Sequence, residues 1–543
     1  MLGKDLAEFD EWRKKEEERD GKIEEKTTDK SKSCLAVNFI EFEGNAVFSK
    51  EKLKKIVKDY KYKCLTKNDI TTILQKISLL YTENGYVTTQ IYIKEQDLKL
   101  KLLTIHIEEG RIEDIIVKND KINTFIVFPG YKNKVLNIKD IDQANDNLLN
   151  IPSYQYKPTI KSGSKPGFSI INIDGKRKIP ISPFMEFDNI GQSYTGHERY
   201  AVGTRIDNIF GLADSLNFKY LSTLNGQSGD RHLQSFIASW SVPVKYAKFG
   251  FNFAYSDYLT TVYTTNQSFQ SKGQMINGTL FAQATVLRSR HIKTVGFINF
   301  NVISSTNYIN NTFSQIQSRN LMNTEVGINN NLYTKYGSFF HRISYIRGLG
   351  TIGTDPLNQG MFDALRFYQV YTIKFKNTPV PFTYQNTIDA QYASQDLYSQ
   401  NQFVLGGFYS IRGFRDVNIY GSMGVLMRND IDFALADYIK SSNKWLQFLT
   451  NNGNGGLVFG LFYDIGIAGS YNQATTASGT GAGTLSSANY GYLSGTGFKI
   501  RYDAEHIQFN FVFSKSLIYP DYLSSSIANT DNFIVYGSVR LVV

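Results

Sequence analysis

The chain has 543 residues and is rich in Phe (38) and Tyr (35), with 43 Gly and only 11 Pro. No run of apolar residues approaches the roughly 20 that a membrane-spanning helix needs, and the mean hydropathy is −0.28. These values argue against a helical membrane protein. They are compatible with a membrane β-barrel, whose strands alternate lipid-facing and lumen-facing residues and therefore have unremarkable average hydropathy.

The net charge of +10 is unevenly distributed along the chain. Residues 34–182 hold 24 basic and 17 acidic residues, a difference of +7. The lysines of this region are scattered between apolar strand positions instead of forming one patch for a phosphate backbone. We therefore expect an electropositive surface that meets a protein partner, and no nucleic acid.

The side chains that usually act in catalysis or ligand binding suggest neither an enzyme nor a cofactor site. The histidines are dispersed, and neither a nucleophile-elbow nor an HExxH pattern is present. The Gly-rich stretch 479–483 is not followed by a helical pattern, so we interpret it as an outer loop and not as a phosphate-binding loop. We expect no catalytic residues, no cofactor and no metal. The six histidines are His106, His197, His232, His291, His341 and His506.

Residues 1–33 form a charged first segment. Leu2, Leu6, Phe9 and Trp12 recur at intervals of three and four, which predicts a helix over about residues 2–19, followed by a linker. From the residues alone, a solvated tail is the simpler interpretation and a detachable helix is the alternative. Because the first residues lack the apolar core of a signal peptide, we expect this to be a mature chain whose export signal has been removed.

Residues 34–109 predict a small α/β unit in the order strand, helix, helix, strand, strand. Strands are expected over 37–42, 86–93 and 101–107, with a helix beginning after Ser49. Thr66 and Asp69 form a capping-box pattern, and apolar residues then mark one face of a helix over 70–81. Cys34 and Cys64 are the only cysteines; an oxidising compartment would permit a disulfide, and two free thiols are equally compatible with the sequence.

A second unit over 110–182 repeats this pattern loosely. A strand is expected over 112–117, a helix over 138–149, and strands over 156–161 and 168–173. From residue 183 onward, alternation of apolar and polar residues dominates to the end of the chain. At about 10 residues per spanning strand, the 361 residues of 183–543 accommodate a 16-stranded barrel, although the count alone does not distinguish fourteen strands from eighteen.

One predicted strand, 457–467, carries a carboxylate whose direction can be inferred. Parity places Phe462, Asp464 and Gly466 on one face, and because a carboxylate facing lipid is costly, this face is predicted to line the lumen. Arg412 lies among turn-forming glycines and could pair with Asp464 in a bidentate manner. The alternative is that both are ordinary hydrated charges of the lumen.

Three segments together resemble a known family. They are 187–196 with 207–214, the run Leu405-Gly406-Gly407-Phe408-Tyr409-Ser410-Ile411-Arg412-Gly413-Phe414 with Arg428-Asn429-Asp430 downstream, and Phe462-Tyr463-Asp464-Ile465-Gly466. Their order and spacing resemble those of the hemolysin- and hemagglutinin-secreting transporters of the ShlB/FhaC/HecB type, the transporter half of two-partner secretion, within the Omp85 superfamily. The two α/β units look like POTRA domains. The final residue, Val543, departs from the aromatic residue with which barrels of this family usually end.

The resemblance implies a domain organisation and a function. Residues 1–33 would form a plug helix and linker, 34–109 and 110–182 two periplasmic POTRA domains, and 183–543 an outer-membrane barrel. The chain would export a secreted exoprotein with an N-terminal secretion domain, contact outer-membrane lipid, and act as a monomer without nucleotide hydrolysis. The alternatives are an assembly factor of the same superfamily, which generally has more POTRA domains, and a passive porin or adhesin, which leaves the two small units unexplained.

The same resemblance assigns roles to two groups of residues. The loop-anchor motif would consist of Arg412, Gly413 and Phe414. The barrel-wall motif would consist of Phe462, Asp464 and Gly466. Pairing of Arg412 with Asp464 would hold the loop inside the barrel.

Overall fold

The computed structural model describes residues 34–542 apart from ten internal segments. By its internal contacts the chain divides into two compact parts, residues up to 111 with 165–168, and residues 112–164 with 169–543. The helix expected over 2–19 and the linker behind it lie outside the described residues. Among the residues that are described, no helix is both long and apolar enough to cross a membrane. The segments left out are 118–121, 225–228, 264–267, 352–358, 436–455, 472–475, 480–481, 486–489, 525–526 and 528–532.

The first α/β domain consists of a three-stranded sheet, β2-β5-β4, a two-stranded sheet, β1-β3, and two α-helices. The helix α3 begins at the capping box predicted from the sequence, in which Thr66 and Asp69 bond each other's backbone amides. Ile73, Ile77 and Tyr81 of this helix are buried in the domain core. The elements are β1 (Leu35–Val37), β2 (Phe39–Glu43), α2 (Lys50–Ile56), β3 (Lys63–Leu65), α3 (Lys67–Glu83), β4 (Gln90–Tyr92) and β5 (Leu102–Glu108).

Two expected strands of this domain differ in extent from the structure. The strand expected over 37–42 is broken after Val37, because β1 pairs with β3 whereas β2 pairs with β5. The strand expected over 86–93 contracts to β4, because the Tyr86 amide donates to the Tyr81 carbonyl and the Thr89 amide to the Tyr86 carbonyl. These local bonds continue the turn at the end of α3 and delay the start of the strand.

A disulfide joins Cys34 to Cys64, with 5.2 Å between their Cα atoms. It lies beside the short β1–β3 pairing, in which Leu35 is opposite Leu65. The structure therefore decides the question that the sequence left open.

The second α/β domain has the sheet order β6-β8-β7 with two helices. Its helix α5 corresponds to the helix expected over 138–149. The short helix α4 was not expected; it is capped by the Asn123 side chain, which accepts from the amides of Phe125 and Ile126. The elements are β6 (Arg111–Val117), α4 (Thr124–Val127), α5 (Ile138–Leu148), β7 (Tyr154–Ser162) and β8 (Phe168–Arg177).

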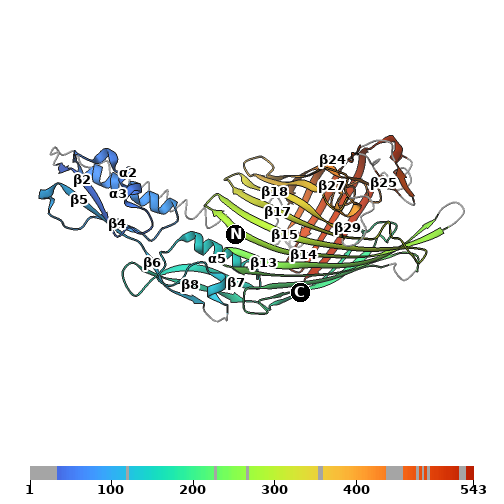
Figure 1. The fold of residues 1–543 in the computed structure, drawn as a ribbon, viewed down its shortest axis with the longest axis horizontal. Helices are drawn as coiled ribbons and strands as arrows, with labels where there is room; N and C mark the ends of the chain where they lie inside the picture. The colour runs from blue at the N-terminus through green and yellow to red at the C-terminus, as the bar shows by residue number, and fades with distance from the viewer. Residues whose placement is uncertain are drawn as a thin grey trace. The chain divides into compact units, whose positions relative to one another are not determined.

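Sixteen antiparallel strands then form a closed barrel (Figure 1). Consecutive barrel strands pair, and the last, β29, pairs with the first, β9. This confirms the expected fold class. The strands are β9 (Ile181–Asp188), β10 (Arg199–Asp207), β11 (Ser215–Thr223), β12 (His232–Val244), β13 (Ala247–Tyr263), β14 (Ser268–Arg288), β15 (Ile292–Ile309), β17 (Arg319–Tyr333), β18 (Gly337–Thr351), β19 (Asp363–Phe375), β20 (Phe382–Ala393), β23 (Met423–Ala434), β24 (Leu457–Gly469), β27 (Tyr490–Asp503), β28 (Ile507–Ile518) and β29 (Ile534–Val542).

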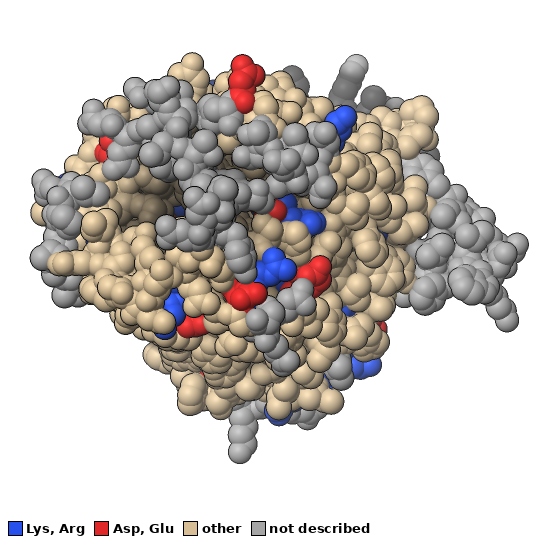
Figure 2. All heavy atoms as spheres, turned by 90° about the vertical axis from the view of Figure 1, so that its right-hand side faces the viewer, with Lys and Arg blue, Asp and Glu red and all other residues tan. Residues whose placement is uncertain are grey.

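The two faces of the barrel wall differ in chemistry, as β24 illustrates. Leu461, Tyr463 and Ile465 point outward and are exposed, whereas Phe462 and Asp464 point inward and are buried. An apolar outer face and a polar inner face are what a lipid-embedded barrel requires. At the end of the molecule shown in Figure 2, the charged side chains among the described residues are few and of mixed sign.

The connection between β20 and β23 folds inward, into the lumen of the barrel. It contains β21 (Phe403–Leu405) and β22 (Asn418–Gly421), which pair with each other, and β22 also pairs with β25 (Thr476–Gly479). Between β21 and β22 lies the segment 406–417, hereafter the inward loop. Leu405, Ile411 and Phe414 share a hydrophobic core with the inward-facing side chains of barrel strands, among them Leu426, Ala468 and Leu493.

Candidate functional site

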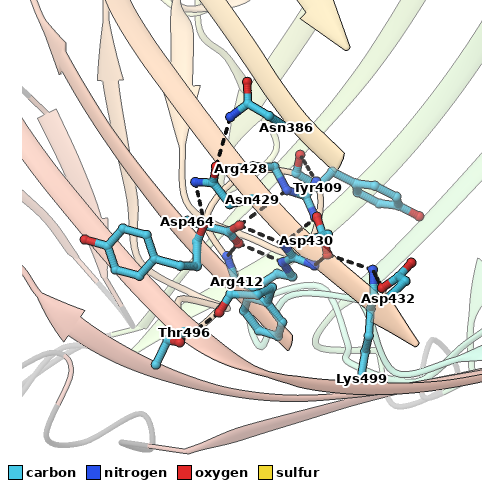
Figure 3. Close-up of polar contacts among 12 residues, drawn as sticks. Asn386, Tyr409, Arg412, Arg428, Asn429, Asp430, Asp432, Asp464, Thr496 and Lys499 are labelled. Atoms are coloured by element: carbon cyan, nitrogen blue, oxygen red, sulfur yellow. Dashed lines mark hydrogen bonds and ion pairs between the residues drawn. The ribbon is translucent and has the colours of Figure 1, made fainter. Parts of the chain in front are cut away.

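The acceptor side of the site is the inner face of β24. Strand alternation turns Asp464 into the lumen, where its carboxylate is completely buried, with 0% of the residue exposed. Directly opposite on β23 is Arg428, and Asp430 on the same strand is directly opposite Phe462. The two strands therefore bring Asp464 and Asp430 to the same inner surface (Figure 3).

Arg412 of the inward loop is held by both carboxylates. Its Nε donates to Asp464 Oδ2 at 2.7 Å and its Nη2 to Asp464 Oδ1 at 2.6 Å, which is the bidentate arrangement of a strong guanidinium–carboxylate pair. The Arg412 backbone amide also donates to Asp464 Oδ2, at 3.0 Å. Nη1 and Nη2 donate to the two oxygens of Asp430 at 2.8 and 3.2 Å. The guanidinium carbon lies 3.8 Å from the centre of the Phe462 ring, close enough for a cation–π interaction.

Further charges surround this pair and balance it. Lys499 of β27 donates to Asp430 at 2.7 Å and lies 2.9 Å from Asp432, while Arg428 lies 3.7 Å from Asp464. The resulting ion cluster contains three cations and three carboxylates, so its net formal charge is zero. Ion pairs can be buried when their charges are balanced and their hydrogen bonds are made. The cluster comprises Arg412, Arg428, Asp430, Asp432, Asp464 and Lys499.

Close backbone approach at two glycines shapes the loop around Arg412. Gly413 has a φ of +108°, a conformation that disfavours any side chain, and a Cβ there would lie 2.8 Å from the Lys515 carbonyl of β28. On β27, a Cβ at Gly495 would lie 1.8 Å from the Arg412 carbonyl oxygen. The barrel wall therefore has no side chain at Gly495, where the backbone of the loop approaches it.

The structure brings together all six residues singled out from the sequence. Arg412, Gly413 and Phe414 occupy the inward loop, and Phe414 packs edge-on against Tyr519 at 6.3 Å. Phe462, Asp464 and Gly466 line β24, and Gly466 lies against Leu405 and Ile411 of the connection.

Sequence reasoning assigned no role to five participants: Arg428, Asp430, Asp432, Lys499 and Gly495. Asp430 lay within a noted motif, and the parity of β23 would have placed it on the lumen face. Lys499 and Gly495 lie on a strand with no motif, and only their pairing with β24 brings them to the cluster.

The inward loop has a second polar attachment, at Asp416. This carboxylate accepts from the Ser193 amide at 2.7 Å and lies 3.6 Å from His197, both in the connection between β9 and β10. Arg415 donates to the Val535 carbonyl of β29 at 2.8 Å. The loop thus contacts the β9–β10 connection and the last strand as well as β24.

The interactions that hold the inward loop are reversible. Ion pairs and hydrogen bonds can be broken and remade without a covalent step, and a balanced cluster limits the charge left unpaired. Within the described part of the chain, no three His, Cys, Asp or Glu side chains are grouped so that they could hold a metal ion.

Family models match both POTRA domains and the barrel as far as residue 485. The sequence model of the haemolysin secretion/activation proteins ShlB/FhaC/HecB matches residues 167–485. The model of the ShlB-type POTRA domain matches residues 35–110, and a second POTRA model matches residues 107–161.

Individual proteins are similar over most of their length. The outer membrane transporter CdiB of Dickeya dadantii (strain 3937) is 27% identical over 405 residues, 74% of this chain and 72% of that protein. The hemolysin transporter protein HpmB of Proteus mirabilis is 23% identical, over 74% of this chain and 73% of that protein. The solved structure of CdiB from Escherichia coli shares the fold with a TM-score of 0.84 at 22% identity, covering 96% of this chain and 92% of that one.

Proposed function

Because the chain belongs to the family of haemolysin secretion/activation proteins ShlB/FhaC/HecB, we propose that it recognises one exoprotein through its POTRA domains and exports it unfolded through the barrel. The chain is an outer-membrane transporter of two-partner secretion, with POTRA domains in the periplasm. The related proteins named above are transporters. In this proposal export requires no nucleotide hydrolysis and no cofactor.

The observation that carries the proposal is the inward loop fastened to the inner wall of a closed barrel. A 16-stranded barrel is wide enough to enclose an aqueous channel, and here part of that interior is occupied by a loop held through reversible ion pairs. The loop-anchor residues Arg412, Gly413 and Phe414 fix the loop, and the wall residues Phe462, Asp464 and Gly466 receive it. We propose that this attachment sets the shape of the lumen through which the exoprotein passes.

The remaining parts of the chain have distinct roles in this proposal. Residues 1–33 act as a plug helix with its linker, 34–109 and 110–182 receive the exoprotein through its N-terminal secretion domain, and 183–543 span the membrane. The chain acts as a monomer in contact with outer-membrane lipid. A sheet edge of a POTRA domain could accept an extended exoprotein segment by β-augmentation.

Secretion of a partner exoprotein, co-expressed with this chain, tests the proposal directly. We expect the exoprotein to reach the culture medium only when this chain is present, with the amounts of other outer-membrane proteins unchanged. Unchanged secretion together with depletion of other barrels would instead identify an assembly factor.

A further inference from the structure

The barrel turn between β10 and β11, residues 208–214, enters the core of the second POTRA domain. Ala213 of this turn is completely buried, with 0% exposed, in one core with Phe128, Leu148 and Ile173 of the domain. The Asn123 amide donates to the Gly211 carbonyl at 3.1 Å, and the Asn150 side chain donates to the Ala213 carbonyl at 2.9 Å. The barrel therefore supplies part of the core of a domain that precedes it in the chain.

Hydrogen bonds hold the 208–214 turn in this conformation. Asn208 and Ala213 both have positive φ, +58° and +56°, which is uncommon for residues with a side chain. The Asn208 side chain accepts from the Ala213 amide at 2.8 Å. The buried Asp214 carboxylate accepts from the Phe210 amide at 3.1 Å and from the Trp240 indole at 3.3 Å. This gives a structural role to the motif at 207–214, which the transport function alone did not explain.

A buried carboxylate secures the base of the turn. Asp207 Oδ2 accepts from the Ser153 amide at 3.0 Å and from the Ser153 hydroxyl at 2.6 Å. Arg205 pairs with Asp207 at 2.8 Å and donates to the Asn150 carbonyl. A buried carboxylate is costly unless its hydrogen bonds are made, and two of the donors to Asp207 come from the POTRA domain.

Two neighbouring barrel turns also form hydrogen bonds and ion pairs with the second POTRA domain. Between β12 and β13, the Lys245 amide donates to the Ile126 carbonyl at 2.7 Å, and the Tyr246 hydroxyl donates to Asp140 at 2.6 Å. At the ends of β14 and β15, Arg288 and Lys293 both pair with Asp146 of α5. Three successive turns thus present donors, acceptors and cations to one face of the domain.

We infer that the second POTRA domain stays docked on the barrel throughout export, with the 208–214 turn as a peg that completes its core. Release would expose Ala213 and would remove the POTRA donors to Asp207 and the cationic partners of Asp146 at once. The exported chain therefore passes beside a fixed domain and does not displace it. The inference rests on the proposed export function.

A covalent lock tests whether release is needed. Phe125 is 68% exposed, and the Lys245 ammonium lies 4.1 Å from the centre of its ring, so Phe125→Cys with Lys245→Cys can be bridged by a short bis-maleimide. The native cysteines are paired with each other and do not compete. We expect the bridged transporter to export the exoprotein as fast as the Phe125→Cys single variant treated with the same reagent. Loss of export in the bridged transporter alone would overturn the inference.

Hydrogen exchange on the full-length transporter tests the peg without relying on export. Asp207→Ala should increase amide exchange in residues 122–151 at least severalfold, while the barrel strands stay protected. The matched control is Asp503→Ala, which removes a pair with Arg501 at the same end of another strand, β27. Unchanged protection of 122–151 in Asp207→Ala would overturn the docking role. If the unaltered transporter exported nothing, the proposed function would fail, and exchange would still decide the docking.

Discussion

At the scale of single residues, Arg412 is the centre of the proposed functional site. The residue is only 3% exposed, and its guanidinium satisfies two carboxylates. Burying such a cluster contributes little net stability, because desolvation offsets the attraction between the charges. Removing one partner is strongly destabilising, because the remaining charges stay buried without compensation. The cluster therefore specifies where the loop lies more than it stabilises the fold.

Replacement of Arg412 tests this specification. We expect Arg412→Ala to reduce secretion about tenfold or more while the barrel still assembles, because breaking a buried ion pair costs about 3–5 kcal/mol. Arg412→Lys should restore secretion only in part, since an ammonium cannot donate in the bidentate geometry. The control is Arg501→Ala, which removes an exposed pair with Asp503. Normal secretion by Arg412→Ala would contradict the anchoring role.

The bare wall at Gly495 gives an independent test of the same contact. A Cβ at this position would lie 1.8 Å from the Arg412 carbonyl, so Gly495→Ala must displace the loop without touching any charge. We expect a secretion defect that resembles that of Arg412→Ala. Gly278→Ala on β14 is the matched control, because a Cβ there meets nothing within 4 Å. Equal secretion by the two alanine variants would show that close approach of the loop is not required.

At the scale of elements, the first POTRA domain depends on a covalent link between two short strands. The strands β1 and β3 each have three residues, too few to be stable as an isolated pair. The disulfide between Cys34 and Cys64 spans a sequence separation of 30 and holds the two strands together. Closing a loop of this length restricts the unfolded chain and so stabilises the domain.

Replacement of both cysteines measures this contribution. We expect Cys34→Ser with Cys64→Ser to destabilise the first POTRA domain by about 3–4 kcal/mol, the range for a loop of this length. Hydrogen exchange in α3 of the full-length transporter would report the loss, while exchange in α5 of the second domain should not change. Unchanged protection of α3 would mean that the hydrophobic core alone determines the stability of the domain.

At the scale of the whole molecule, the barrel, its inward loop and the docked second POTRA domain form one compact part. Export then depends on what occupies the lumen besides the loop. Residues 1–33 are the proposed occupant, because the family resemblance implies a plug helix there, and Leu2, Leu6, Phe9 and Trp12 would form its apolar stripe. If the stripe seats this segment in the pore, its removal opens a path for ions.

Conductance measurements in planar bilayers test the plug. Deletion of residues 1–33 should raise the single-channel conductance. A chain in which the four apolar residues of the stripe are changed to Ser keeps its length and charge, and it should show the same increase. Conductance equal to that of the unaltered chain in both cases would support the alternative of a solvated tail.

The sequence by itself determined only local structural features. Side chains of a strand alternate between two faces, so the inward direction of Asp464 followed from the residues of one strand, and the Thr66–Asp69 cap followed from a spacing of three. The tertiary structure alone decided that Cys34 meets Cys64, that Arg412 and Lys499 share Asp430, and that Ala213 completes the core of a domain more than 30 residues before it. These contacts depend on strand register and on packing between distant segments, which no local pattern encodes.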